Sequence, residues 1–526
     1  MKPTIAALLL VLVSGCVGPK ATAGTVLVSI AVDGARLEVN LPAGSTVQSA
    51  VEQAGIQMGE LDRVEPAVYA VLTDGAQVKL WRRTERFEVE TQVLPFARQT
   101  IRNEGLPEGE TRLLQAGSNG LEEISYRVLE EEGELISRQV YQRSVTQEPM
   151  PEIIMVGAQV AHSPLALEGK LAYLTGGNAW IIEGNSANRR PVVVSGDLDG
   201  QVFKLSANGR WLAFTRGLEQ DETDFNSLWV IDLEDPSAEA LDTGARNVVH
   251  FADWSPDPDV SALAYSTVEP RPSPPGWQAN NDLLLLTLSA AGRIVERESL
   301  LPTNPGGLYG WWGTSFAWAP DGVHLAYARP DEVGLIDSRE PGFTPLFPLT
   351  PYLTGSDWAW VPGVTWGSNS RTLYLVDHGS PVGFEEPGSS PIFDLVAVNW
   401  PGGAEVQLVA RTGMFAYPSA SPVQVLQSGE IAGQVAFLQA LTPLKSELSA
   451  YRLMVMDRDG SNLRSIFPAE GDPGIGQAEL APAAWSPSAA RVALVYRGDL
   501  WVVDVASGAG QPLTGDGLTI AFDWKP

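Results

Sequence analysis

The side chains best suited to bind a ligand are aromatic, and they stand in two short stretches of the second half of the chain. The stretches are Leu308-Tyr309-Gly310-Trp311-Trp312-Gly313 and Trp358-Ala359-Trp360. Flat aromatic faces stack on sugar rings and on peptide side chains. The alternative is that these rings pack between structural repeats. We predict a ligand-binding site formed by Tyr309, Trp311, Trp312, Trp358 and Trp360.

Motifs for catalysis or metal binding are sparse. The single cysteine, Cys16, excludes an intramolecular disulfide and a Cys-based zinc site, and the four histidines have no paired spacing. The stretch Asp457-Arg458-Asp459-Gly460 is similar to the start of a calcium loop, but no distal Glu follows, so a turn explains it better. The nucleophile motif Gly-x-Ser-x-Gly is absent. We predict no catalytic residue, no metal site and no cofactor.

Length and composition indicate a multidomain globular protein. The chain has 526 residues, more than one hydrophobic core usually serves, so two to four domains are expected. The 52 glycines and 39 prolines suit many short strands joined by turns. The formal net charge is −28, which argues against nucleic acid as a partner because phosphate binding needs basic patches.

The chain begins with a basic residue, an apolar run and a cysteine. Lys2 precedes the apolar residues 5–13 and then Ser14-Gly15-Cys16, which is typical of an export signal that ends at a cleavage point. The end of this pattern resembles the lipobox of bacterial lipoproteins, which implies that Cys16 is diacylated; an ordinary signal peptide with an incidental cysteine is the alternative. We expect a signal peptide at 1–16 and a tether at 17–24. The mature protein would be extracytoplasmic and held in a membrane by its lipid, at the cell surface or in the periplasm.

Residues 25–84 have the pattern of a small α+β module. Alternating apolar residues on both sides of Asp33-Gly34 predict a β-hairpin. A helical pattern opens at Ser45-Thr46, and Gly55 ends it. Ala54-Gly55-Ile56 and Leu72-Thr73-Asp74-Gly75 resemble a ubiquitin-like module of bacterial cell-wall proteins.

Residues 85–157 contain a different set of motifs. They are Leu94-Pro95-Phe96, Leu106-Pro107-Glu108-Gly109-Glu110 and Gly117-Ser118-Asn119-Gly120. The motifs resemble the G-five domain, a bacterial surface module named for its glycines. The resemblance implies flat, elongated β-sheets with little core. It also implies affinity for polymers that contain N-acetylglucosamine, so peptidoglycan or another wall polymer is an expected partner.

Residues 158–526 repeat a turn followed by a short apolar strand. The clearest copy is Trp318-Ala319-Pro320-Asp321-Gly322 leading to Leu325-Ala326-Tyr327. The other six copies begin at His162, Ser206, Trp254, Trp366, Ser419 and Trp485. Units of roughly 40–65 residues with four short strands predict a β-propeller. The amino-acid pattern of these units resembles the TolB-type propeller repeats of bacterial envelope proteins. Seven blades are favoured over six or eight, with residues 520–526 closing the ring as a strand of the first blade.

Together these segments predict a mainly β protein with two small modules and a propeller. We expect a lipid-anchored envelope protein that acts as a binding or scaffold module. Its G-five domain would bind wall glycan, and its propeller would bind a polymer or another envelope protein. The alternative is an extracellular hydrolase of wall glycan or peptide with a carboxylate pair in the propeller channel.

Overall fold

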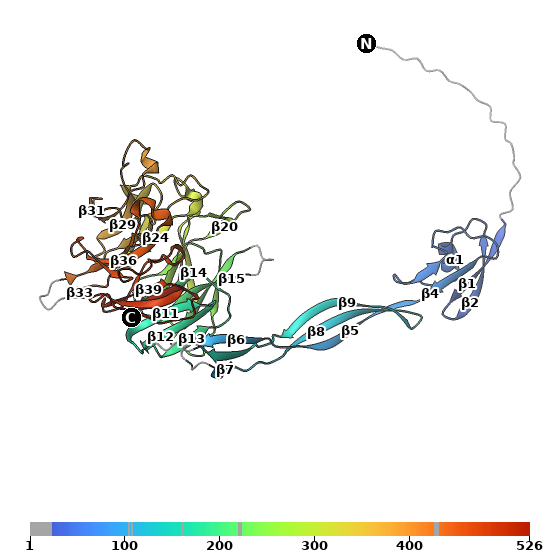
Figure 1. Ribbon diagram of the computed structural model, residues 1–526. Coiled ribbons are helices and arrows are strands. Elements are labelled where there is room, and N and C mark those ends of the chain that lie inside the picture. Colours follow the sequence, from blue (N-terminus) through green and yellow to red (C-terminus); the bar gives the residue numbers. More distant parts are fainter. Residues whose placement is uncertain (1–23, 104–105, 107–108, 159–162, 219–223, 426–430) are drawn as a thin grey trace, which may run out of the picture. The chain divides into compact units, whose positions relative to one another are not determined.

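The computed structural model describes residues 24–103, 106, 109–158, 163–218, 224–425 and 431–526. Cys16, the signal peptide and His162 lie outside these residues. The described residues form two compact units: those up to Thr100 with Arg112–Met155, and Ile101–Thr111 with Val156–Pro526. Strands are the main secondary structure of both units (Figure 1). No helix in the described part of the chain is long and apolar enough to cross a membrane.

The first module pairs a β-hairpin with one helix. Its sheet has the order β2-β1-β4-β3. The elements are β1 (Thr25–Val32), β2 (Ala35–Pro42), α1 (Val47–Gln53), β3 (Arg63–Glu65) and β4 (Gln77–Trp81). Alternate residues of β1 are buried, as expected for a strand with one face on a core. The Thr46 hydroxyl accepts the N–H of Ser49 and caps the helix. The buried side chains of Val47, Ala50 and Val51 on this helix complete the core of the module.

The second segment is formed by two three-stranded sheets. One has the order β5-β8-β9 and the other β6-β10-β7. Their strands are β5 (Arg83–Leu94), β6 (Arg98–Asn103), β7 (Thr111–Gln115), β8 (Gly120–Glu131), β9 (Glu134–Gln147) and β10 (Glu152–Gly157). The 12 to 14 residues of β5, β8 and β9 give strands about 40–46 Å long at ~3.3 Å per residue.

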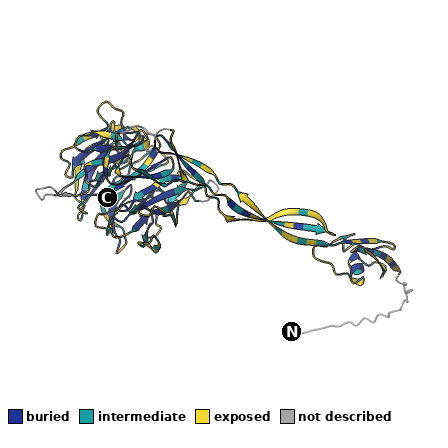
Figure 2. Ribbon diagram, turned by 90° about the horizontal axis from the view of Figure 1, so that it is seen from below, coloured by how far each residue is buried: buried dark blue, intermediate teal, exposed yellow. Residues whose placement is uncertain are grey.

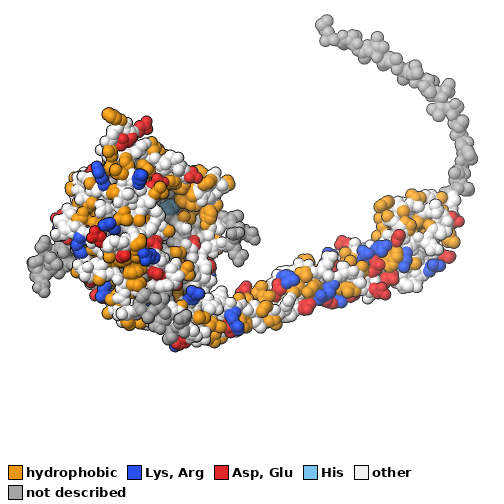
Figure 3. All heavy atoms as spheres, in the orientation of Figure 1, with side chains coloured by type: hydrophobic (Ala, Val, Ile, Leu, Met, Phe, Trp, Pro, Cys, Tyr) orange, Lys and Arg blue, Asp and Glu red, His pale blue; other side chains and the backbone are white. Residues whose placement is uncertain are grey.

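The β5-β8-β9 sheet has little apolar core. Phe87, Val89 and Tyr141 are all exposed, and exposed residues predominate along β5 and β9 (Figure 2). Charged side chains of both signs cover the sheet (Figure 3) and pair across strands, as Arg127 does with Glu85 at 2.8 Å. Exposed pairs of this kind contribute only about 0–1 kcal/mol each, so the backbone ladders carry most of this sheet. The expectation of sheets with little core is confirmed.

Seven four-stranded antiparallel sheets follow one another in the described part of residues 158–526. From the channel outward, the first sheet is β42 (Thr519–Lys525), β11 (Ala166–Thr175), β12 (Asn178–Asn185) and β13 (Arg189–Val193), and the second is β14 (Leu198–Leu205), β15 (Trp211–Gly217), β16 (Asn226–Asp232) and β17 (Leu241–Arg246). The third is β18 (Ala252–Trp254), β19 (Ala262–Tyr265), β22 (Leu283–Leu288) and β23 (Ile294–Leu301), the fourth is β24 (Ser315–Trp318), β25 (His324–Ala328), β26 (Glu332–Asp337) and β27 (Thr344–Pro348), and the fifth is β28 (Val364–Trp366), β29 (Thr372–His378), β30 (Phe393–Asn399) and β31 (Glu405–Val409). The sixth is β32 (Ser419–Ala420), β35 (Gln434–Ala440), β36 (Tyr451–Asp457) and β37 (Arg464–Phe467), and the seventh is β38 (Ala484–Trp485), β39 (Arg491–Tyr496), β40 (Asp499–Asp504) and β41 (Gly510–Pro512). Short hairpins add β20 (Val268–Pro270) with β21 (Trp277–Ala279) and β33 (Gln424–Val425) with β34 (Ile431–Ala432).

The sheets are the blades of a closed seven-bladed propeller. The first strands of neighbouring sheets contact one another all the way round the ring. β42 pairs with β11, with Trp524 opposite Leu171, and so completes the first blade from the far end of the chain. The Asp523 carboxylate also accepts the N–H of Leu205 in the second blade at 2.8 Å. The predicted seven blades and the predicted closing strand are both confirmed.

The tryptophan that begins a repeat ties one blade to the blade before it. The indole Nε1 of Trp254 donates to the carbonyl of Lys204 at 3.0 Å, and that of Trp366 donates to Ala317 at 3.1 Å. Trp318 and Trp485 make the equivalent bonds to Asp253 and Ser419. Each ring is buried or half-buried in an apolar cluster between blades. These four tryptophans therefore hold neighbouring blades of the ring together.

Candidate binding site

Three connections between strands reach the same face of the propeller. Within a blade successive strands run antiparallel, so the link between its second and third strands and the link to the next blade emerge at the same end. The first aromatic loop, residues 302–314, joins β23 to β24, and the second aromatic loop, residues 349–363, joins β27 to β28. The β20–β21 hairpin is inserted between β19 and β22.

These connections line an open pocket of about 580 Å³, the aromatic cavity. That volume lies within the roughly 300–1,000 Å³ of small-molecule sites. Four of the five predicted binding residues line it: Tyr309, Trp311, Trp312 and Trp358. The other lining residues are Pro274, Tyr352, Leu353, Thr354, Gly355, Ser356, Asp357 and Ala359. The structure thus brings together aromatic residues from two loops that lie almost 50 positions apart in the chain.

Trp360, the fifth predicted residue, does not line the cavity. Its side chain is only 3 % exposed, and its Nε1 donates to the carbonyl of Met414 at 3.1 Å. The ring packs edge-on against Phe393 with centroids 5.0 Å apart. Trp360 therefore holds the second aromatic loop on the ring, because its indole finds both an apolar cluster and a carbonyl acceptor in the next blades.

The buried Asn281 anchors the first aromatic loop. Its Nδ2 donates to the carbonyl of Gly310 at 2.8 Å, and its Oδ1 accepts the hydroxyl of Thr314 at 2.8 Å. Arg329 supports the same loop, since its guanidinium donates to Asn304 Oδ1 at 3.3 Å. These residues are separated in sequence from the aromatic ones. The aromatic residues that identified the loop in the sequence did not indicate that Asn281 and Arg329 support it.

The backbone of the first loop presents its rings to solvent. Tyr309 has a φ of 56°, in the left-handed region, and the 3-10 helix η1 (Gly310–Trp312) follows it directly. This geometry leaves Tyr309 and Trp311 exposed by 38 % and 36 %. Trp312 packs edge-on against Trp277 of the hairpin, with centroids 6.1 Å apart. One ring is thus fixed, and two are open to a ligand.

The second aromatic loop is fixed by its own turn and by a histidine. The Thr354 hydroxyl donates to the carbonyl of Trp358 at 2.6 Å and accepts the N–H of Ser356. The ring nitrogens of buried His378 lie 3.0 Å and 2.7 Å from the carbonyl oxygens of Thr350 and Ser390. His378 therefore bridges the second aromatic loop and the loop that joins β29 to β30.

Ionisable groups are few in this cavity. Burial, with a smaller effect of the Glu447 carboxylate, raises the pKa of Tyr352 above its usual value, so its phenol is neutral at physiological pH. Asp357 is the one charged residue that lines the cavity. No group of three His, Cys, Asp or Glu in the described part of the chain could hold a metal ion. The arrangement suits stacking and hydrogen bonding.

Carboxylates also occur in the central channel, where the hydrolase alternative would need them. Asp253 and Asp523 line a channel cavity of about 540 Å³ together with Lys525. Each carboxylate accepts the N–H of the residue that follows it. Asp523, and to a lesser extent Asp253, raises the pKa of Lys525 against the opposing effect of burial. The channel cavity thus holds two carboxylates and two ammonium groups, those of Lys525 and Lys204.

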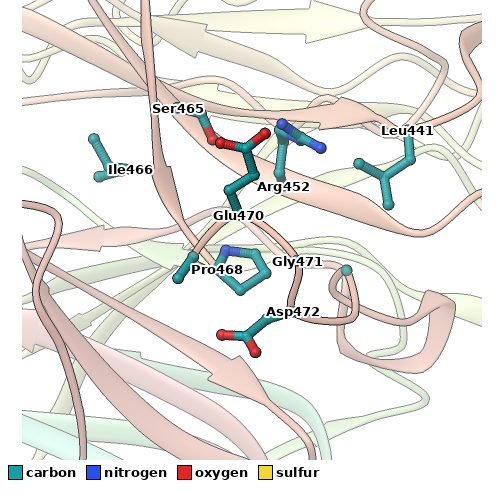
Figure 4. A pocket seen from close by; sticks show the side chains of 10 residues that line it. Leu441, Arg452, Ser465, Ile466, Pro468, Glu470, Gly471 and Asp472 are labelled. Atoms are coloured by element: carbon teal, nitrogen blue, oxygen red, sulfur yellow. The ribbon is translucent and has the colours of Figure 1, made fainter.

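A further cavity, of about 330 Å³, lies on the sixth blade. Arg452 of β36 and the loop after β37, with Glu470 and Asp472, contribute its charged groups. The two carboxylates point in different directions (Figure 4). They therefore do not form a converging acid pair.

Comparison with known proteins defines the class of the N-terminal segments. Residues 85–159 match the G5 domain family, and residues 28–68 match the family described as the G5-linked ubiquitin-like domain. Both resemblances predicted from sequence motifs are confirmed. No curated protein sequence matches the chain. The protein therefore combines a G5-linked ubiquitin-like domain, a G5 domain and a seven-bladed β-propeller.

Several solved structures are similar to parts of the chain at low overall similarity. A chain described as putative TolB from Agrobacterium tumefaciens is 18 % identical, and the match covers 62 % of this chain and 96 % of that one with a TM-score of 0.35. The periplasmic gluconolactonase of Pseudomonas aeruginosa is 14 % identical, with 69 % and 100 % covered and a TM-score of 0.40. The G5 domain of an IgA1 protease is 25 % identical, with 15 % and 94 % covered and a TM-score of 0.13. The propeller assignment here rests on the order and closure of the sheets.

Proposed function

We propose that this chain is a non-catalytic glycan-binding protein of the bacterial cell envelope, whose propeller binds a saccharide in the aromatic cavity. The observation that carries the proposal is the convergence of Tyr309, Trp311, Trp312 and Trp358 on one cavity. Sugar rings present apolar C–H faces that stack on aromatic rings, and their hydroxyls pair with the phenol and indole N–H groups around them.

The test is a calorimetric titration of the protein with oligosaccharides of wall-type hexosamines. Trp311→Ala removes one open ring, and the expected loss is about tenfold in affinity. Phe384→Ala is the matched control, because Phe384 is fully exposed and does not line the cavity. Equal affinity of Trp311→Ala and the wild type would refute a site in this cavity. Release of reducing sugar in the same samples would favour the hydrolase alternative.

The proposal includes a lipid anchor and a wall-binding role for the G5 domain. Cys16 would carry the acyl chains, and two or more chains are needed for stable anchoring. Cys16→Ala is expected to move the protein from the membrane fraction to the soluble fraction of cells. Sedimentation of residues 158–526 beside the full chain with purified peptidoglycan tests the G5 domain, because the shorter chain should bind less if the N-terminal segment contributes.

A further inference from the structure

The aromatic cavity carries a negative charge and no positive one. Among its twelve lining residues Asp357 is charged, and none is Lys or Arg. Its rings are three tryptophans and two tyrosines, and the face of each ring is the negative end of a quadrupole. The electrostatic character of the cavity therefore favours a cation over a neutral or an anionic group.

The carboxylate of Asp357 does not stabilise a turn, unlike the carboxylates of several other aspartates of the propeller. Asp235, Asp459 and Asp504 each accept the hydroxyl and the N–H of a nearby serine and so stabilise a turn. Among the described residues Asp357 takes part in no hydrogen bond or ion pair, and the turn around it is closed by the Thr354 hydroxyl instead. Its carboxylate is exposed at the cavity wall between Ser356 and Trp358.

A carboxylate beside open aromatic rings is the arrangement that binds an ammonium group. Cation–π attraction contributes roughly 0.5–2 kcal/mol, and the carboxylate adds a charge-assisted hydrogen bond. The net charge of −28 raises the local concentration of cationic ligands further. The flat walls offered by five rings exceed what one ammonium group covers, so the rest of the ligand must also be stackable.

We infer that the cavity selects saccharides whose amino sugars carry a free ammonium group over the same saccharides in N-acetylated form. The ammonium group pairs with Asp357, and the sugar ring stacks on the open rings, chiefly Trp311. This inference rests on the proposed function, since it names the sugar that the proposed site prefers. An N-acetylated unit keeps the stacking but loses the charge.

The experiment compares tetramers of glucosamine and of N-acetylglucosamine, titrated into the protein at a mildly acidic pH where the amine is protonated. The glucosamine tetramer is expected to bind roughly tenfold more tightly. Asp357→Asn should abolish this preference and leave the affinity for the acetylated tetramer unchanged. Asp357→Glu should restore part of it. Glu386→Gln is the matched control, because it removes one exposed carboxylate that does not line the cavity.

The outcomes separate the inference from the proposed function. Equal affinity for both tetramers, unaffected by Asp357→Asn, overturns the inference and leaves glycan binding intact. Absence of binding by either tetramer overturns the proposed function. Tetramethylammonium or lysine that binds as tightly as the glucosamine tetramer overturns the assignment of a sugar as the ligand. A preference for glucosamine that persists in Asp357→Asn places the cation elsewhere and also overturns the inference.

Discussion

Trp358 and Trp360 are two positions apart and have different tasks. Trp358 lines the cavity, whereas the indole of Trp360 donates to Met414 in a later part of the chain. The amino-acid type is the same, so composition alone could not separate the two. What separates them is a carbonyl acceptor 54 residues away, which only the folded ring brings near Trp360.

Asn281 is expected to control ligand affinity without touching the ligand. Asn281→Ala leaves the carbonyl of Gly310 and the hydroxyl of Thr314 without their partner, at about 1–3 kcal/mol for a buried polar group. The first aromatic loop then loses its anchor, and glycan affinity should fall roughly tenfold. Calorimetry measures this, with Asn369→Ala in an exposed turn as the control. An unchanged affinity would show that the loop is held by other contacts.

Asp377 should make the thermal stability of the propeller depend on pH. Burial, and then the nearby Glu405 and Asp394 carboxylates, raise its pKa from 3.8 to about 6. Because the folded state binds this proton more tightly than the unfolded state, protonation of Asp377 stabilises the fold. This contribution to the free energy of unfolding is fully present below about pH 4 and is lost as the pH rises through 6. Asp377→Asn stays neutral, and its Tm should exceed that of the wild type by the order of 1 °C at pH 7.5. Scanning calorimetry at pH 4 should show the difference gone; a difference that persists there would argue against this cause.

At the scale of the blade, one indole hydrogen bond links neighbouring sheets. Trp366→Phe keeps the ring in its apolar cluster but removes the donor to Ala317, at about 1 kcal/mol for a typical hydrogen bond. The Tm of the propeller should fall by about 1–2 °C. Trp358→Phe is the same chemical change at a cavity position, and it should leave the Tm unchanged. Equal shifts in the two variants would mean that ring size, and not the hydrogen bond, matters.

The sequence determined the elements better than the loops between them. The repeated turn and apolar strand predicted the number of blades, because each repeat must encode the same strand pair and turn. The segment from Ile520 has the residue pattern that begins each repeat, and this pattern predicted the closing strand. The loops vary from blade to blade, so their anchors Asn281, Arg329 and His378 had no repeated signal. Their roles depend on contacts with residues distant in the chain.

At the scale of the whole molecule, the two compact units have separate cores and should unfold in separate thermal transitions. Asp523→Asn weakens the bond from the closing strand to Leu205 in the second blade. It should lower only the transition of the propeller, by about 1–4 °C. Differential scanning calorimetry resolves the two events, and Asp357→Asn serves as the control. A single transition that shifts as one would show that the units are coupled.

The closing strand also determines how late in synthesis the propeller can complete its fold. β11 is made early, but its partner β42 follows roughly 350 residues later, which takes about 20–70 s at the usual ~5–20 residues per second of synthesis. Throughout that interval one edge of β11 waits without its native partner. An open edge is a template for pairing with another chain. Slower synthesis would lengthen that interval, so this propeller is most vulnerable to such pairing before β42 is made.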